Sequence, residues 1–301
     1  MRLKIDRQRL IEYSVFSIIG ILLFVIFMVG TFKDLQIAEA VANTSSWYGK
    51  FFDIFGQMTV SIPVISLIVL FFIALNKKGI IINKYLEYSI YSIAIIIFVI
   101  TGWMDIISEK NSDKTKIISA VINTILFLSL YSGIIYYLKF KKPEFIYNDS
   151  KLLEKVVTAL LFVIATFVMM QLLKFVFSRP RPRTVMADID EYREWWNIHY
   201  TEHWKINKSF PSGHSTSAIS ILALALVWDR RTTRYYSTIA IAIATTVIVA
   251  TSRMVITAHF LTDVTGATIF SFIWFGIFNW LRNDKMTWVD KIIKKKEARN
   301  G

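Results

Sequence analysis

The sequence predicts an all-α membrane protein, a polytopic bundle of about eight transmembrane helices in a single domain that covers residues 1–301. The chain is 54% hydrophobic with a mean hydropathy of +0.48, which is too apolar for an ordinary soluble domain of this length. Several apolar runs also reach the roughly 20 residues that a helix needs to cross about 30 Å of hydrocarbon. The chain has no cysteine, which excludes disulfides, thiolate metal sites and cysteine nucleophiles.

Eight apolar runs define the expected spans. The first follows a basic N-terminus and is longer than the apolar core of a signal peptide, so we expect an uncleaved helix there. The spans are predicted at about 11–32, 57–75, 87–108, 116–138, 152–173, 213–228, 235–253 and 262–282. Residues 1–150 then hold the N-terminal spans, residues 151–282 form a core with the motifs described below, and residues 283–301 form a basic tail.

The distribution of charge sets the expected orientation. The net charge is +13, and basic residues gather at 2–9, 77–84, 139–151, 230–234 and 291–299. All five clusters fall on one side of an eight-span arrangement, so the positive-inside rule places them and both termini in the cytoplasm. We therefore expect a multi-pass protein of the cytoplasmic membrane. No recognised nucleic-acid motif accompanies the charge, so we expect no nucleic-acid partner.

The loops on the other side differ in character. Segment 33–56 places apolar and aromatic residues among polar ones, which predicts an amphipathic helix lying in the outer membrane interface. The loop over 183–208 is acidic and aromatic. It is either a lid that recognises a lipid head group or an interfacial anchor with solvated charges, and both interpretations stay open. The residues behind these alternatives are Asp188, Asp190, Glu191, Glu194, Trp195 and Trp196.

Two further polar features suggest other sites, and for both we favour the simpler explanation. His199 and His203 lie four residues apart with Glu202 between them, but this set has fewer ligands than a metal site needs. We therefore expect no metal and no cofactor. Asp105 lies near the outer end of the third span, and we interpret it as a helix-end residue that reaches water.

Three short motifs fall at or beside the last two outer loops. They are Lys174-Phe-Val-Phe-Ser-Arg-Pro-Arg181-Pro182, then Pro211-Ser212-Gly213-His214, then Ser252-Arg253-Met-Val-Ile-Thr-Ala-His259-Phe-Leu-Thr-Asp263. Lys174, Arg181 and Arg253 are three cations suited to bind phosphoryl oxygens, because the planar guanidinium pairs with two of them at once. Ser212 is suited to cap the sixth span, whose first backbone N–H groups are free to bind an anion, and Gly213 lets the backbone approach closely.

The remaining motif residues supply acid, base and nucleophile. His259 and Asp263 are four residues apart, which on a helix places both on one face. The carboxylate then fixes the imidazole tautomer and leaves the other ring nitrogen to attack phosphorus, while it stabilises the positive charge of the phosphohistidine that forms. His214 is left to protonate the leaving group, so the two histidines need different protonation states.

Together the motifs read K-x6-R-P, P-S-G-H and S-R-x5-H-x3-D, and this set resembles the signature of the type 2 phosphatidic acid phosphatase (PAP2) superfamily. The resemblance covers about 150–282. It implies a six-helix catalytic core with His259 as nucleophile, Asp263 as its partner and His214 as general acid. It also implies that the phosphate is held by Lys174, Arg181, Ser212, Gly213 and Arg253. Spans three and four exceed that core, and their role stays open.

We therefore expect an integral membrane lipid phosphatase that works without a metal on the outer face. Among lipid phosphates, undecaprenyl diphosphate is favoured, because recycling of that carrier in envelope synthesis needs dephosphorylation outside. Phosphatidic acid and phosphatidylglycerol phosphate are close rivals, and a soluble sugar phosphate is less favoured. A non-enzymatic lipid binder or transporter is the alternative from another class, although simple binding requires neither a nucleophile nor an acid. The oligomeric state stays open.

Overall fold

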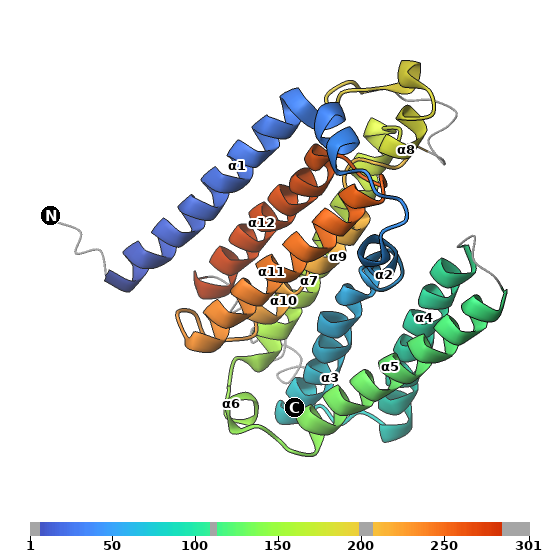
Figure 1. Ribbon diagram of the computed structural model, residues 1–301. Coiled ribbons are helices and arrows are strands. Elements are labelled where there is room, and N and C mark those ends of the chain that lie inside the picture. Colours follow the sequence, from blue (N-terminus) through green and yellow to red (C-terminus); the bar gives the residue numbers. More distant parts are fainter. Residues whose placement is uncertain (1–6, 109–112, 199–206, 285–301) are drawn as a thin grey trace, which may run out of the picture.

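The computed structural model describes residues 7–108, 113–198 and 207–284, and within these ranges the protein is helical with no strand (Figure 1). The predicted all-α bundle is confirmed. The longer helices are α1 (Arg7–Val41), α2 (Trp47–Phe55), α3 (Ser61–Lys77), α4 (Lys84–Ser108), α5 (Asp113–Lys139), α7 (Leu152–Phe177), α11 (Thr233–Val255) and α12 (Leu261–Asp284). The shorter elements are η1 (Gln57–Val60), α6 (Glu144–Tyr147), α8 (Pro182–Val185), η2 (Ile189–Glu191), α9 (Gly213–Ile219) and α10 (Leu222–Ala225).

Seven helical segments of the described ranges are long and apolar enough to cross a membrane, against the eight spans that we predict. The difference lies at 213–228, which forms the two short helices α9 and α10 rather than one long helix. This stretch is rich in serine and threonine, whose hydroxyls bond to nearby backbone carbonyls and compete with regular helix geometry. The Oγ of Ser220, for example, donates to the Ser217 carbonyl at 2.6 Å where α9 ends.

The broken segment still runs between the two ends of α12. At its start, the Ser212 backbone N–H donates to the Asp263 carbonyl in the first turn of α12. Near its end, Arg282 in the last turn of α12 donates to the carbonyls of Leu226 and Trp228. The side chains of α9 are largely buried, so this segment needs no lipid-facing surface. It lies at the centre of the bundle, packed by α7, α11 and α12.

The first outer segment also differs from our expectation. Residues 33–41 continue α1 beyond its apolar stretch, and only Trp47–Phe55 forms the separate helix α2. Ser46 caps α2, since its side chain accepts from the Gly49 N–H. Trp47 is 79% exposed and Phe51 is 46% exposed on this helix, as expected for a helix in a membrane interface. A bond from the Asn43 N–H to the Val255 carbonyl ties the preceding turn to the end of α11.

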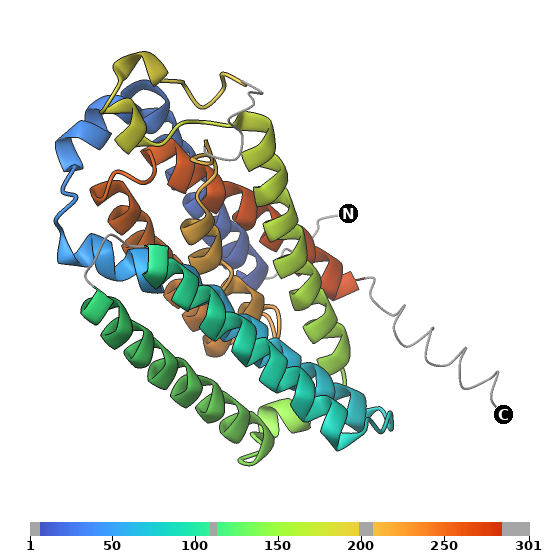
Figure 2. The same ribbon diagram turned by 90° about the vertical axis from the view of Figure 1, so that its right-hand side faces the viewer.

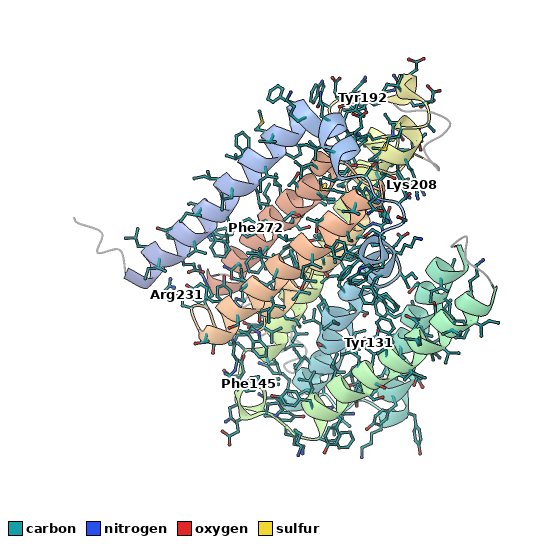
Figure 3. The ribbon with its side chains drawn as sticks, viewed as in Figure 1. Tyr131, Phe145, Tyr192, Lys208, Arg231 and Phe272 are labelled. Atoms are coloured by element: carbon teal, nitrogen blue, oxygen red, sulfur yellow. The ribbon has the colours of Figure 1, made fainter. Side chains whose placement is uncertain are left out.

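The bundle has two distinct ends, which we call the α8 end and the opposite end. Figure 3 shows Tyr192 and Lys208 at the α8 end and Arg231 and Phe145 at the opposite end. Helices α1, α12 and α11 run between the two ends side by side (Figure 1). The main hydrophobic core lies between the two ends of the bundle and is formed by residues of α3, α7, α10, α11 and α12. One continuous core therefore supports both ends.

Helices α4 and α5, our expected third and fourth spans, form a hairpin that packs against α3 at the edge of the bundle (Figure 2). A smaller apolar cluster that includes Met58, Phe127 and Tyr131 fills this contact. The buried Glu87 and the partly exposed Lys139 tie the two helices together with an ion pair of 2.6 Å. Large apolar side chains of the hairpin point outward, which suits contact with lipid. The side chain of Asp105 lies outside the described part of this hairpin.

Candidate active site

The three motifs meet at the α8 end around one cavity of about 470 Å³. Six of the eight predicted site residues line it, although they come from three separate stretches of the chain. Lys174 lies in the last turn of α7, Gly213 and His214 begin α9, and Arg253 lies in the last turn of α11. The full lining is Asp53, Gln57, Phe167, Met170, Gln171, Lys174, Arg181, Arg183, Gly213, His214, Arg253 and His259.

The first motif begins in the last turn of α7 and continues past the end of this helix along the cavity. Ser178 adopts a left-handed conformation (φ 40°), and its N–H bonds to the Lys174 carbonyl, which closes the helix. The chain then passes through Pro180 into α8, which begins at Pro182. A Cβ atom at position 213 would lie 3.2 Å from the Lys174 Nζ, so glycine there keeps the space beside this ammonium open. The motif spacing thus places Lys174 and Arg181 on the same cavity.

Within the part of the chain that the structure describes, four cations line the cavity rather than the three that we predict. The additional one is Arg183, whose backbone N–H donates to the Thr257 carbonyl at 3.0 Å and so ties α8 to the turn before His259. Arginine recurs at 179, 181 and 183, and this alternation is the sequence signal by which Arg183 could have been found. The buried Nε of Arg181 has no hydrogen-bond partner within the described ranges. Such a group has an unmet donor, which an anion in the cavity would satisfy.

One carboxylate, that of Asp53 from α2, faces these cations. It pairs with the Arg253 guanidinium, and its backbone carbonyl lies 3.1 Å from the His214 Nε2. The interfacial helix therefore reaches into the cavity and contacts two of the predicted site residues. Sequence reasoning missed Asp53, and the available signal was an acidic residue on the polar face of an amphipathic segment.

Ser212 and Asp263 lie behind the cavity wall rather than in it, and both side chains are fully buried. Ser212 caps α9 as predicted, because its Oγ accepts from the Ser215 N–H at 3.3 Å. Its own N–H donates to the Asp263 carbonyl at 3.0 Å. These bonds fix the start of α9 against the start of α12, which sets the position of His214 relative to His259.

His259 and Asp263 are close together but do not share a helix. His259 lies in the turn before α12, and Asp263 lies in the first turn of that helix. The His259 Nδ1 is 3.7 Å from the Asp263 Oδ2, longer than a normal hydrogen bond. The carboxylate instead closes the turn by accepting from the Phe260 N–H at 2.8 Å. Because Nδ1 faces Asp263, Nε2 is the ring nitrogen left for chemistry in the cavity.

The protonation state of His259 follows from its surroundings. The side chain is 2% exposed, and burial lowers its pKa to about 3, although the nearby Asp263 carboxylate works in the other direction. The ring is therefore neutral at ordinary pH, which is the state a nucleophilic imidazole requires.

Asp263 is held from two sides by groups that sequence reasoning missed. Its Oδ1 accepts from Arg179 at 2.7 Å, and its Oδ2 accepts from the Ser209 Oγ at 2.5 Å. Arg179 in turn contacts Asp34 of α1. We expected Asp34 to fall in an outer loop, and the motif pattern selects Arg181 rather than Arg179, so neither residue attracted attention.

The pair His199 and His203, with Glu202 between them, lies outside the described residues. Within the described ranges, no group of three or more histidine, aspartate and glutamate side chains is arranged to hold a metal.

Comparison with known proteins gives one match. Residues 155–287 match the sequence model of the PAP2 superfamily, and this range includes all three motifs. No curated protein and no solved structure matches the chain.

Proposed function

Since residues 155–287 form a PAP2 superfamily domain within a helical membrane protein, we propose that this protein is an integral membrane lipid phosphatase of the phosphohistidine type. One observation supports the proposal most directly. Two histidines and four cations from three separate segments line the same cavity. A cradle of fixed cations, a neutral nucleophile and a second histidine for the leaving group are what phosphoryl transfer requires.

The proposed reaction has two steps. Lys174, Arg181 and Arg253 bind the phosphoryl oxygens, and the His259 Nε2 attacks phosphorus. The bond from phosphorus to the lipid oxygen breaks, and that oxygen takes a proton from His214. Burial and the nearby Arg253 lower the pKa of His214, so this histidine must take up that proton together with the anionic substrate. Water then attacks the phosphohistidine while His214 takes a proton back, which releases inorganic phosphate and restores the neutral His259. Asp263 stabilises the positive charge on the His259 ring between the two steps.

The cations around the cavity support chemistry without a metal, because they supply the charge that Mg²⁺ supplies in many other phosphoryl-transfer enzymes. Vanadate, which mimics five-coordinate phosphorus, is then expected to inhibit, whereas EDTA is not. Loss of activity on chelation, followed by recovery with a divalent metal, would rule out the metal-free mechanism.

Among substrates we favour a polyprenyl diphosphate such as undecaprenyl diphosphate, acted on at the outer face of the cytoplasmic membrane. The positive-inside pattern supports this orientation, and recycling of that carrier needs dephosphorylation outside. Phe167 and Met170 of α7 line the cavity on the side of an apolar helix, which suits a phosphate attached to a long hydrocarbon chain. Phosphatidic acid and phosphatidylglycerol phosphate fit the same description and remain rival substrates.

A lipid binder or transporter that uses the cations only to hold phosphate is the competing proposal from another class. The presence of His214, His259 and Asp263 beside the cavity favours the enzyme, because binding alone needs no nucleophile. If His259→Ala and His214→Ala leave the cellular function unchanged, the binder or transporter is favoured instead.

Phosphate release by the detergent-purified protein tests the proposal. Undecaprenyl diphosphate, phosphatidic acid and phosphatidylglycerol phosphate are compared in the presence of EDTA, with His259→Ala as the control. We expect release that disappears in the variant, and the fastest substrate then identifies the lipid class. No release from any of the three by folded protein would contradict the phosphatase.

A further inference from the structure

The buried guanidinium of Arg179 lies directly behind the proposed catalytic pair. Its side chain is 2% exposed, and three of its hydrogen bonds go to side chains. It donates to the Asp263 Oδ1 at 2.7 Å, to the Thr262 Oγ1 at 2.8 Å and to the Asp34 Oδ2 at 3.0 Å. A fourth bond, from its Nε to the Arg193 carbonyl at 2.9 Å, fixes the stem. Few directions remain in which this side chain can move.

Asp34 connects this guanidinium to α1. Besides Arg179, it accepts from the Thr262 backbone N–H at 3.0 Å and from the Thr262 hydroxyl. Gly30 lies one turn earlier on α1, where a Cβ atom would meet the Thr262 Cγ2 at 2.9 Å. The glycine therefore permits the close approach of α1 to the start of α12 that brings Asp34 to the site.

Arg179 also contacts the turn that contains His259. Its guanidinium lies over the Phe260 ring at 4.2 Å from the ring centre, and Phe260 directly follows His259. The Phe260 N–H and the Ser209 hydroxyl both donate to the Asp263 Oδ2. Arg179 on one oxygen and these two donors on the other fix the plane of the Asp263 carboxylate. The orientation of that plane determines where the Asp263 Oδ2 lies relative to the His259 Nδ1.

We propose that Arg179 and Asp34 are positioning residues for phosphoryl transfer, which act by fixing the Asp263 carboxylate and, through it, the His259 imidazole. The proposal rests on the phosphatase function proposed above. Asp34 holds one edge of the guanidinium, Arg179 holds Asp263, and Asp263 orients the ring. The N-terminal helix α1, which lies outside the matched domain, thereby becomes part of the catalytic apparatus.

Glu12 offers a matched control on the same helix. It is also fully buried, and it pairs with Arg230 and Arg231 at the opposite end of the bundle. A purely structural role for Asp34 predicts that Asp34→Asn and Glu12→Gln have similar effects. A positioning role predicts that only Asp34→Asn changes the chemistry.

The main test uses Asp34→Asn and Arg179→Lys. Asparagine keeps an oxygen for the Thr262 N–H and leaves the Arg179–Asp263 pair intact, so we expect the variant to fold. Lysine keeps the charge of Arg179 but loses its planar fork. We expect kcat to fall by about 10- to 100-fold in Arg179→Lys, the loss typical when a group that orients a metal-bound histidine is removed. Asp34 acts on Asp263 only through Arg179, so the fall in Asp34→Asn should be smaller, about 3- to 10-fold. KM should stay within about 2-fold in both.

A spectroscopic readout separates positioning from stability. The chain contains 4 histidines, so single substitutions suffice to assign their ring nitrogen resonances. The His259 nitrogens should shift in Asp34→Asn and Arg179→Lys and stay unchanged in Glu12→Gln. An unchanged kcat and an unchanged His259 signal in folded Arg179→Lys would overturn the proposal. An equal loss of kcat in Glu12→Gln would also overturn it, because the effect would then be general.

Failure of the phosphatase function gives a different pattern. In that case the wild-type protein releases no phosphate from any lipid tested, yet the His259 resonances still respond to Asp34→Asn. If Arg179→Lys does not fold, the milder Asp34→Asn decides the question alone, by the same two readouts.

Discussion

The two ends of α1 each bury a carboxylate, and comparing them shows how a structural ion-pair cluster differs from one that lies beside the proposed active site. Glu12 bonds to Arg230, Arg231 and the Tyr235 hydroxyl, so it ties α1 to the loop before α11 and to the start of that helix. Asp34 bonds to Arg179, whose other carboxylate partner is Asp263. Burial and charge pairing are alike at the two ends. The α8 end differs because its cluster adjoins two histidines and a cavity lined by cations.

Replacing one arginine at each end should give the largest difference in activity between the two ends. Arg253→Ala removes a cation of the cradle and is expected to lower kcat/KM by about 10²- to 10³-fold, the usual cost of losing one group that stabilises transition-state charge. Arg230→Ala removes a cation of the Glu12 cluster and is expected to leave kcat/KM within about 2-fold. Phosphate release per folded molecule provides the measurement. Similar losses in both variants would show that the cations act through stability alone.

The next largest expected effect is the dependence of the free energy of unfolding on the protonation of His259. Burial lowers its folded-state pKa to about 3, whereas the unfolded chain has the ordinary value near 6.5. Between these values the unfolded state binds a proton that the folded state does not, so the free energy of unfolding falls as the pH is lowered. From pH 6.5 to pH 4 the expected loss is roughly 3 kcal/mol.

Thermal unfolding in detergent, compared with His259→Asn, isolates this contribution. The wild-type stability should fall more steeply with acid than that of the variant, because asparagine does not titrate. Parallel curves for the two proteins would contradict a neutral buried His259.

Asp53 should control how tightly the cradle binds anions. Its carboxylate pairs with Arg253 where a phosphate is expected to bind. Asp53→Asn removes the competing charge, so inhibition by vanadate should become about 3- to 10-fold tighter. Glu191 is exposed in η2 and lies outside the cavity lining, so Glu191→Gln should change inhibition less than 2-fold. Weaker inhibition in Asp53→Asn would mean that Asp53 assists binding instead.

The smallest effect is expected from the approach of α1 to α12. Gly30→Ala places a methyl group 2.9 Å from the Thr262 Cγ2, so α1 must move and take Asp34 with it. We expect kcat to fall by about 2- to 5-fold, with a small loss of stability. Gly20→Ala on the same helix meets no atom within 4 Å and should leave kcat unchanged. A larger loss from Gly20→Ala than from Gly30→Ala would contradict this account of the contact.

Much of the fold was predictable because hydrophobic length alone determines where long apolar helices occur. The broken segment at 213–228 was not, since its residues are apolar enough for a span and its serine and threonine hydroxyls act only in the folded backbone. The extension of α1 to Val41 was missed for a related reason. Polar residues such as Asp34 ordinarily mark the end of a span, and here the partner that permits burial, Arg179, lies far away in sequence.

The site was predictable to the extent that its motifs are local. Lys174, Gly213 and His259 were identified by spacing, and the structure places them on one cavity. Asp53, Arg183 and Arg179 were missed because the local signals for them, an acidic residue on an amphipathic segment and arginine at alternate positions, do not tell which segments come into contact. The assumption that His259 and Asp263 share a helix was wrong, because the Asp263 carboxylate caps the turn at Phe260 and α12 begins only at Leu261.

Trapping the covalent intermediate tests the central claim, that His259 at the α8 end attacks phosphorus. The purified protein is mixed with a lipid substrate labelled in its terminal phosphate, quenched in alkali, where phosphohistidine survives, and digested to locate the label. We predict that the label resides on the peptide containing His259 and is absent from His259→Ala, while Glu12→Gln labels like the wild type. Phosphate release by the wild type with no labelled peptide under rapid quenching, or label on another residue, would contradict the account.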